Sequence, residues 1–161
     1  MGSGKIHGRL AGLLERGGIY PDIHGSTPRE VLNALIEKIP ALPSVPQALL
    51  LTAALEREAL MSTGIGNGIA LPHPRNPLIT EEEKQFVALA YPENPLDWYS
   101  LDERPVHSLF FIMSASAKLH LQILAELTFF SRQEDFCKML KGRASIEELQ
   151  RFIGEAEKKW E

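Results

Sequence analysis

The chain has 161 residues, of which 44% are hydrophobic and 24% are charged, and its formal net charge at pH 7 is −4. This length fits one domain with a substantial core, and the negative charge argues against a nucleic-acid binder that depends on a broad basic field. No apolar run approaches the roughly 18 residues that cross a bilayer, so direct membrane insertion is not expected. The single cysteine, Cys137, excludes an internal disulfide and, without a signal-peptide pattern, favours a cytoplasmic protein.

The first third of the chain contains three helical patterns and one strand pattern. Residues 5–16 have apolar side chains at helical spacing and predict an N-terminal helix or the tail of a longer linker. Residues 19–23 alternate like a short edge strand. Capping boxes at residues 27–30 and 44–47 predict two helices, and Arg57 lies near the end of the second.

A glycine-rich stretch then leads to a histidine between two prolines. Glycines alternate over residues 64–68, which allows the backbone to approach another molecule closely. A short apolar strand over 69–71 follows. Pro72 and Pro74 fix the backbone on either side of His73, an arrangement that suits a side chain that must meet another molecule. The glycine spacing matches neither a dinucleotide fingerprint nor a Walker nucleotide loop.

The second half of the chain alternates strands with helices. Apolar runs at 86–91 and 106–113 predict core strands. Ser116 is expected to cap the helix that follows it, and capping boxes at 131–134 and 145–148 predict two further helices. Strands that alternate with helices indicate the α/β class.

The run R-E-x-L-x-S-T-G-I-G-N-G-I-A-L-P-H, residues 57–73, resembles a known phosphorylation-site signature. It is the signature of the IIA components of the bacterial sugar phosphotransferase system, of the fructose/mannitol type and most closely of its nitrogen-regulatory branch. The resemblance covers roughly residues 19–154. It implies the mannitol/fructose-type IIA fold, a small mixed β-sheet flanked by helices on both faces. We therefore expect a IIA domain over 19–161 and an N-terminal segment or short helix over 1–18.

The resemblance also implies which residues carry the chemistry. His73 matches the family's phosphoryl acceptor, which reacts through Nε2. Arg57 matches an arginine sixteen positions earlier, and His120, in H-L-x-x-L, matches a second histidine that opens a helix. Without the resemblance, Arg57 is an ordinary surface arginine and His120 a boundary histidine. Three hydroxyls are the expected substrate-binding groups: Ser62, Thr63 and Ser114.

Phosphoryl relay suits histidine, because a neutral imidazole is a good nucleophile near neutral pH. The resemblance implies a phosphotransferase in which His73 takes a phosphoryl group from the histidine phosphocarrier protein, without a cofactor or a metal. The recipient is either a IIB component of a sugar permease or a regulated cytoplasmic protein. A chain without an evident fused IIB or membrane domain favours regulation.

Two alternatives follow from the residues beside His73. The family usually has Gly or Ala after this histidine, whereas this chain has Pro74, which has no N–H to offer a phosphate. The alternative function is therefore a catalytically silent IIA-like binding or regulatory module. A metal site made of His73 and His120 is a weaker alternative, because no carboxylate or thiolate lies near them in the sequence.

Overall fold

One mixed sheet and the helices around it make up residues 9–159, the part of the chain that the computed structural model describes. The strands are β1 (Ile19–Ile23), β2 (Gly64–Gly66), β3 (Ile69–Ala70), β4 (Phe86–Pro92) and β5 (Ser108–Met113). The helices are α1 (Arg9–Gly17), α2 (Pro28–Ile36), α3 (Gln47–Leu60), α4 (Ala117–Ser131), α5 (Glu134–Lys141) and α6 (Ile146–Lys158), with a short 3-10 helix η2 (Glu82–Lys84). The strand order is β1-β4-β5-β3-β2, so the predicted α/β class is confirmed.

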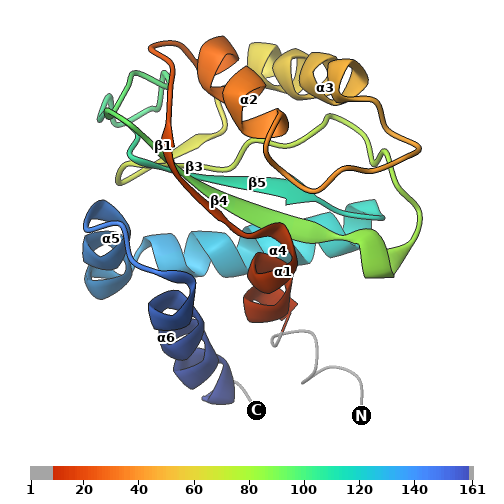
Figure 1. Ribbon diagram of the computed structural model, residues 1–161. Helices are drawn as coiled ribbons and strands as arrows, with labels where there is room; N and C mark the ends of the chain where they lie inside the picture. The colour runs from red at the N-terminus through yellow and green to blue at the C-terminus, as the bar shows by residue number, and fades with distance from the viewer. Residues whose placement is uncertain (1–8, 160–161) are drawn as a thin grey trace.

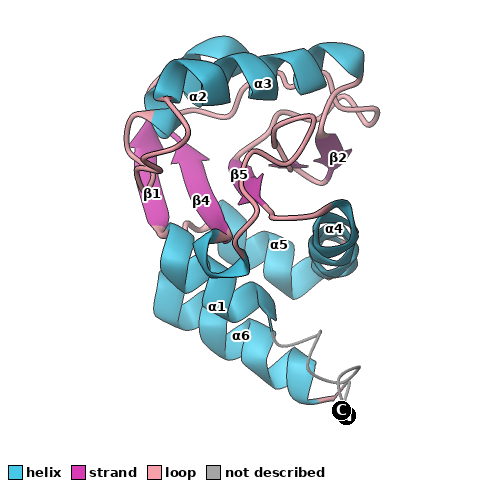
Figure 2. Cartoon of the chain, turned by 90° about the vertical axis from the view of Figure 1, so that its right-hand side faces the viewer, coloured by secondary structure: helices cyan, strands magenta, loops and turns pink. Residues whose placement is uncertain are grey.

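The sheet lies between two layers of helices (Figure 1 and Figure 2). α2 and α3 cover one face, where their apolar side chains pack in one buried cluster with Trp98. α1, α4, α5 and α6 cover the other face, in a second buried cluster that includes Phe110 and Phe130. Alternate residues of β4 and β5 belong to the two clusters, as the two-residue period of a strand requires. The predicted small mixed sheet with helices on both faces is confirmed.

α1 belongs to the helical layer on the second face. Leu10, Leu13 and Leu14 are buried there, and Gly17 lies so close to the backbone of β4 that a Cβ would be 2.1 Å from the carbonyl oxygen of Val87. The helix ends where the sequence predicts. Gly18 then takes a φ of +86° that favours glycine. The start of the predicted helix, residues 5–8, lies outside the described residues.

Capping signals that need only local geometry are confirmed. The hydroxyls of Thr27 and Ser116 each accept a hydrogen bond from a backbone N–H in the first turn of their helix. Ser145 and Glu148 form the complete predicted capping box of α6. In α2 the carboxylate of Glu30 accepts from the N–H and hydroxyl of Ser26, so the reciprocal bond lies one residue before the cap.

Two of the predicted capping boxes are wrong. The chain is still in a turn at Val45, whose N–H donates to the carbonyl of Leu42, so α3 begins only after Pro46 and without a side-chain cap. Ser131 is the last residue of α4. Its hydroxyl donates to the carbonyl of Thr128, three residues earlier in the same helix, a bond that competes with capping the next helix.

The glycine-rich stretch forms a hairpin. β2 pairs antiparallel with β3, and the connection places Asn67 at φ +57° and Gly68 at φ +79°. Both values are positive, as a tight two-residue hairpin requires, and Asn-Gly is the residue pair most suited to it. The sequence analysis noted the alternate glycines of residues 64–68 but did not predict this hairpin.

β3 brings His73 beside the end of β5. The two strands are parallel, with Ala70 beside Leu109. The N–H of Ile112 donates to the carbonyl of Pro72, which continues the alignment to the residue before His73. Because α4 begins four residues after β5, His73 also lies beside the first turns of α4.

Candidate functional site

The position of the proton on His73 is set by a local hydrogen bond. The ring is buried, with 8% of the residue exposed, and Nδ1 lies 2.8 Å from the carbonyl oxygen of Leu71. A carbonyl oxygen only accepts hydrogen bonds, so Nδ1 carries the proton and donates it. The lone pair of the neutral ring is therefore on Nε2, which is the atom available as a nucleophile.

His120 packs directly against His73. The ring centroids are 4.3 Å apart and the ring planes are inclined by 52°. His120 lies in the first turns of α4, at the helix start that the Ser116 hydroxyl caps. The structure thus brings together two histidines that are 47 positions apart in the sequence, one from the segment after β3 and one from the start of α4.

Both histidines are kept neutral. Burial lowers the pKa of His73, the hydrogen bond to Leu71 opposes this shift, and the positive charge of Arg57 adds to it. Burial, then His73 and then Arg57 lower the pKa of His120 to about 4. At pH 7 the pair therefore presents two uncharged imidazoles, and an unprotonated Nε2 is what a nucleophilic histidine requires.

Arg57 lies near the end of α3 and is half-buried. Its Nη1 donates to the carbonyl oxygen of Met61 over 2.7 Å, which ties the guanidinium to the turn after the helix. Its charge acts on both His73 and His120, so the cation lies within electrostatic reach of the pair. The remaining N–H groups of a guanidinium suit a phosphoryl group with several oxygens.

A small cavity of about 40 Å³ adjoins the histidine pair. His73, Pro74, Ser114 and His120 line it, together with side chains from the loop after Pro74 and the end of β5. The Ser114 hydroxyl makes no hydrogen bond to any other residue in the range 9–159. The volume fits about one water molecule, far below the roughly 300–1,000 Å³ of a site that encloses a small-molecule ligand.

The hydroxyls of Ser62 and Thr63 are held by the scaffold instead. The carboxylate of Glu58 accepts from both the N–H and the hydroxyl of Thr63, each over 2.7 Å. Trp98 Nε1 donates to Thr63 Oγ1 over 3.2 Å. The Ser62 hydroxyl donates to the Trp98 carbonyl over 2.5 Å and accepts from the N–H of Gly64 over 3.0 Å.

Comparison with known proteins places this arrangement in a family. The family model described as "Phosphoenolpyruvate-dependent sugar phosphotransferase system, EIIA 2" matches residues 13–156. The chain belongs to this family. It is a phosphotransfer protein of that system, and the predicted resemblance to IIA components is confirmed.

Relatives of this EIIA protein are found among both regulatory and sugar-specific proteins. It is 29% identical over 152 residues to the nitrogen regulatory protein of Escherichia coli K12, and the match covers 92% of this chain and 91% of the relative. It superposes on the nitrogen regulatory protein IIA-Ntr of Neisseria meningitidis with a TM-score of 0.78 at 22% identity, covering 90% and 99% of the two chains.

A third match is the complex of enzyme IIAMTL and phosphorylated enzyme IIBMTL from Escherichia coli. The TM-score is 0.64 at 19% identity, and the match covers 84% of this chain and 93% of that one. At such identities the two solved structures show the fold alone. None of the helices that the structure describes is long and apolar enough to cross a membrane.

The EIIA fold gathers only part of the predicted set of site residues. His73, His120 and Ser114 share one cavity, and Arg57 acts on both histidines. Ser62 and Thr63 are engaged elsewhere. Within residues 9–159 no group of three or more His, Cys, Asp or Glu side chains is arranged to hold a metal ion.

Two further contributors were missed by the sequence analysis. One is the Leu71 carbonyl, which fixes the tautomer of His73. Every residue has a backbone carbonyl, so the residue type at position 71 could not indicate this role. The other is Glu58, which is half-buried, follows Arg57 on α3 and accepts hydrogen bonds from the N–H and hydroxyl of Thr63. Its position in the run R-E-x-L-x-S-T was the available signal.

Proposed function

We propose that His73 accepts a phosphoryl group on Nε2 and that the chain is a phosphohistidine carrier of the phosphotransferase system. The observation that carries the proposal is the hydrogen bond from His73 Nδ1 to Leu71, with the neutral ring of His120 packed beside it. This geometry supplies an unprotonated nucleophile in a fixed orientation, without a base to remove a proton first.

The transfer step involves only the His73 ring and the phosphohistidine of the donor. The Nε2 lone pair of His73 forms a bond to the phosphorus of a donor phosphohistidine. The P–N bond of the donor breaks, and its electron pair returns to the donor imidazole. Phosphoryl transfer of this kind asks the protein mainly for positioning and charge stabilisation.

Arg57, His120 and Ser114 would stabilise the transferred group. The phosphoryl oxygens carry negative charge, which the nearby guanidinium of Arg57 attracts. Ser114 has an uncommitted hydroxyl in the same cavity as His73. His120 packs against the acceptor ring at 4.3 Å, within reach of a group attached to it.

The surroundings of the site fit a protein donor. The cavity at His73 is too small to enclose a sugar phosphate or a nucleotide, so the phosphorus must arrive from outside. Leu60, Met61 and Leu121, next to the site residues in the sequence, are 60%, 71% and 65% exposed. Exposed apolar side chains close in the sequence to Arg57 and His120 suit docking of another protein, which we take to be the histidine phosphocarrier protein.

The recipient is a IIB component or a regulated cytoplasmic protein. The IIAMTL–IIBMTL complex supports recipients of the first kind, since that neighbour has the same fold. The long match to a nitrogen regulatory protein supports the second. We favour regulation, because that match extends over 92% of the chain.

Pro74 supports one competing function. It lines the cavity and has no N–H for a phosphoryl oxygen. A chain disabled in this way would be a silent IIA-like binding module. Pro74→Ala restores an N–H, so a transfer rate that is absent in the wild type and present in this variant would establish the silent module.

Transfer of labelled phosphate from the phosphorylated histidine phosphocarrier protein tests the proposal. We expect an acid-labile, base-stable label on the wild type and none on His73→Ala. The matched control is His24→Ala, because His24 is an exposed histidine directly after β1 and does not line the cavity at His73. A label that persists in His73→Ala would contradict the assignment of the acceptor.

A further inference from the structure

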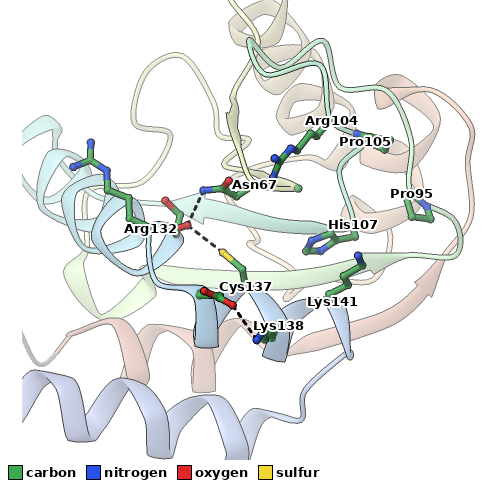
Figure 3. A pocket seen from close by; sticks show the side chains of 12 residues that line it. Asn67, Pro95, Arg104, Pro105, His107, Arg132, Cys137, Lys138 and Lys141 are labelled. Carbon is green, nitrogen blue, oxygen red and sulfur yellow. Dashed lines mark hydrogen bonds and ion pairs between the residues drawn. The ribbon is translucent and has the colours of Figure 1, made fainter.

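A second and larger cavity, of about 540 Å³, lies at the other end of α4 (Figure 3). Its walls come from the β2–β3 turn, the loop before β5, the end of α4 and α5. Ser131 lines it, eleven residues along α4 from His120, which corresponds to about 16 Å of helix. It shares no lining residue with the cavity at His73.

Two cationic side chains and an imidazole, from the loop before β5 and from α5, meet at this cavity, although the whole chain has a net charge of −4. Arg104 comes from the loop before β5, His107 from the residue just before that strand and Lys141 from the end of α5 (Figure 3). Burial, and next the charge of Lys141, lower the pKa of His107. Lys141 therefore lies close enough to His107 for its positive charge to disfavour the protonated imidazole.

These cations are poorly neutralised by the protein itself. The side chain of Lys141 makes no hydrogen bond or ion pair with any other residue that the structure describes. Arg104 reaches Asp102 only at 4.0 Å. By contrast, Lys138 is paired with Glu134 at 3.0 Å, although it lines the same cavity. Uncompensated like charges around a cavity of this size are stabilised by a bound anion.

The rest of the lining suits an organic group. Pro95, Pro105 and Cys137 give the cavity an apolar wall. The volume lies within the range of about 300–1,000 Å³ that is typical of small-molecule sites. A ligand with a compact dianion at one end and an organic body at the other would use both parts of the cavity.

We propose that this cavity is a second ligand site, which binds an organic phosphomonoester with its phosphate between Arg104, His107 and Lys141. The guanidinium and the ammonium supply charge-assisted hydrogen bonds to the phosphate oxygens, and the imidazole supplies a further N–H. The site is separate from the transfer at His73 and does not depend on it.

Phenyl phosphate and inorganic phosphate are suitable probes. We expect saturable binding of one phenyl phosphate per chain, with NMR shift changes at His107 and the end of α5. Inorganic phosphate should bind more weakly, because it cannot use the apolar wall. Equal affinity for the two probes would overturn the assignment of an organic ligand, and no saturable binding of either would overturn the site.

Variants locate the binding. Arg104→Gln and Lys141→Gln should each weaken phenyl phosphate binding by roughly tenfold or more, because each removes one charge-assisted contact. Lys38→Gln, an equal loss of charge at an exposed residue outside this cavity, should leave the affinity unchanged, and so should His73→Ala. Loss of binding in His73→Ala with full binding in Lys141→Gln would place the probe at the transfer site and contradict the proposal. If Lys38→Gln weakens phenyl phosphate binding as much as Arg104→Gln and Lys141→Gln do, the binding is general charge attraction and the proposed site is contradicted.

Discussion

His73 donates its Nδ1 proton to the carbonyl oxygen of Leu71, two residues earlier in the chain, over 2.8 Å. The bond is local, and the prolines at 72 and 74 restrict the backbone that makes it. The same short segment therefore carries the proposed nucleophile and selects its tautomer. His120, from another element, adds a neutral ring against it.

Arg57→Ala should slow phosphorylation of the chain on the order of 100-fold, because it removes a positive charge that acts on both His73 and His120. Stability should change little, since the side chain is half-buried and the hydrogen bond it donates is to the carbonyl of Met61. The pKa of both His73 and His120 should rise, because the positive charge that lowers them is gone. Transfer kinetics and NMR titration of the imidazoles measure the two effects.

The matched control for Arg57→Ala is Arg29→Ala, an exposed arginine on α2. It should leave the transfer rate and both histidine pKa values unchanged. If Arg57→Ala transfers phosphate at the wild-type rate, the guanidinium has no part in the site.

His120 should make the fold sensitive to acid. Its pKa is about 4 in the folded protein, whereas an exposed histidine in the unfolded chain titrates near 6.5. Between these values the unfolded chain binds more protons, so the free energy of unfolding falls as the pH drops from about 6.5 to 4. His120→Asn should lose this contribution, which denaturant unfolding at several pH values will measure as a shallower pH dependence than that of the wild type. An unchanged pH dependence would mean that His120 is not held neutral.

Glu157→Gln should stabilise the protein at alkaline pH. Glu157 and Glu126 are both buried, at 8% and 6% exposure, and burial raises the pKa of Glu157. A raised pKa of an acid favours folding while the acid is protonated, and this contribution is lost as the pH rises through the folded value. The gain in melting temperature should therefore be larger at pH 8 than at pH 5. Glu155→Gln, an exposed neighbour on α6, should show no such difference.

Variants of Thr63 and Ser114 should have opposite effects: the first should lower the free energy of unfolding, and the second should slow phosphoryl transfer. Thr63→Val removes the hydroxyl that bonds both Glu58 and Trp98, and should cost about 1–3 kcal/mol in the free energy of unfolding. Ser114→Ala should leave stability nearly unchanged and slow phosphoryl transfer, because its hydroxyl faces the cavity at His73. Urea unfolding and transfer kinetics on both variants, with the exposed Thr52→Val as control, check the contrast. The reverse pattern would assign the phosphoryl contact to Thr63.

Features that depend on local geometry could be predicted from the sequence. The caps at Thr27, Ser116 and Ser145 require only the residues of one helix turn, and all three form. The predicted caps at Ser44 and Ser131 fail because a turn or an earlier helix claims the same residues. The capping-box sequence is present at Ser44 and Ser131, but neither serine caps the helix that follows it.

Features assembled from distant elements left weaker signals. Arg104 and Lys141, 37 positions apart, lie on a loop and a helix and share no periodic pattern with His107. The proximity of His73 and His120 was accessible only through the family resemblance, since it depends on how β3 and α4 meet. The Leu71 carbonyl could not be predicted at all, because every residue type carries one.

The most direct test is the position of the phosphoryl group after transfer from the phosphorylated histidine phosphocarrier protein. NMR of phosphorylated protein with 15N-labelled histidine distinguishes the two ring nitrogens of each imidazole. We predict phosphorus on Nε2 of His73, with Nδ1 still protonated and bonded to Leu71. Phosphorus on Nδ1 of His73, or on any other residue, would contradict the account.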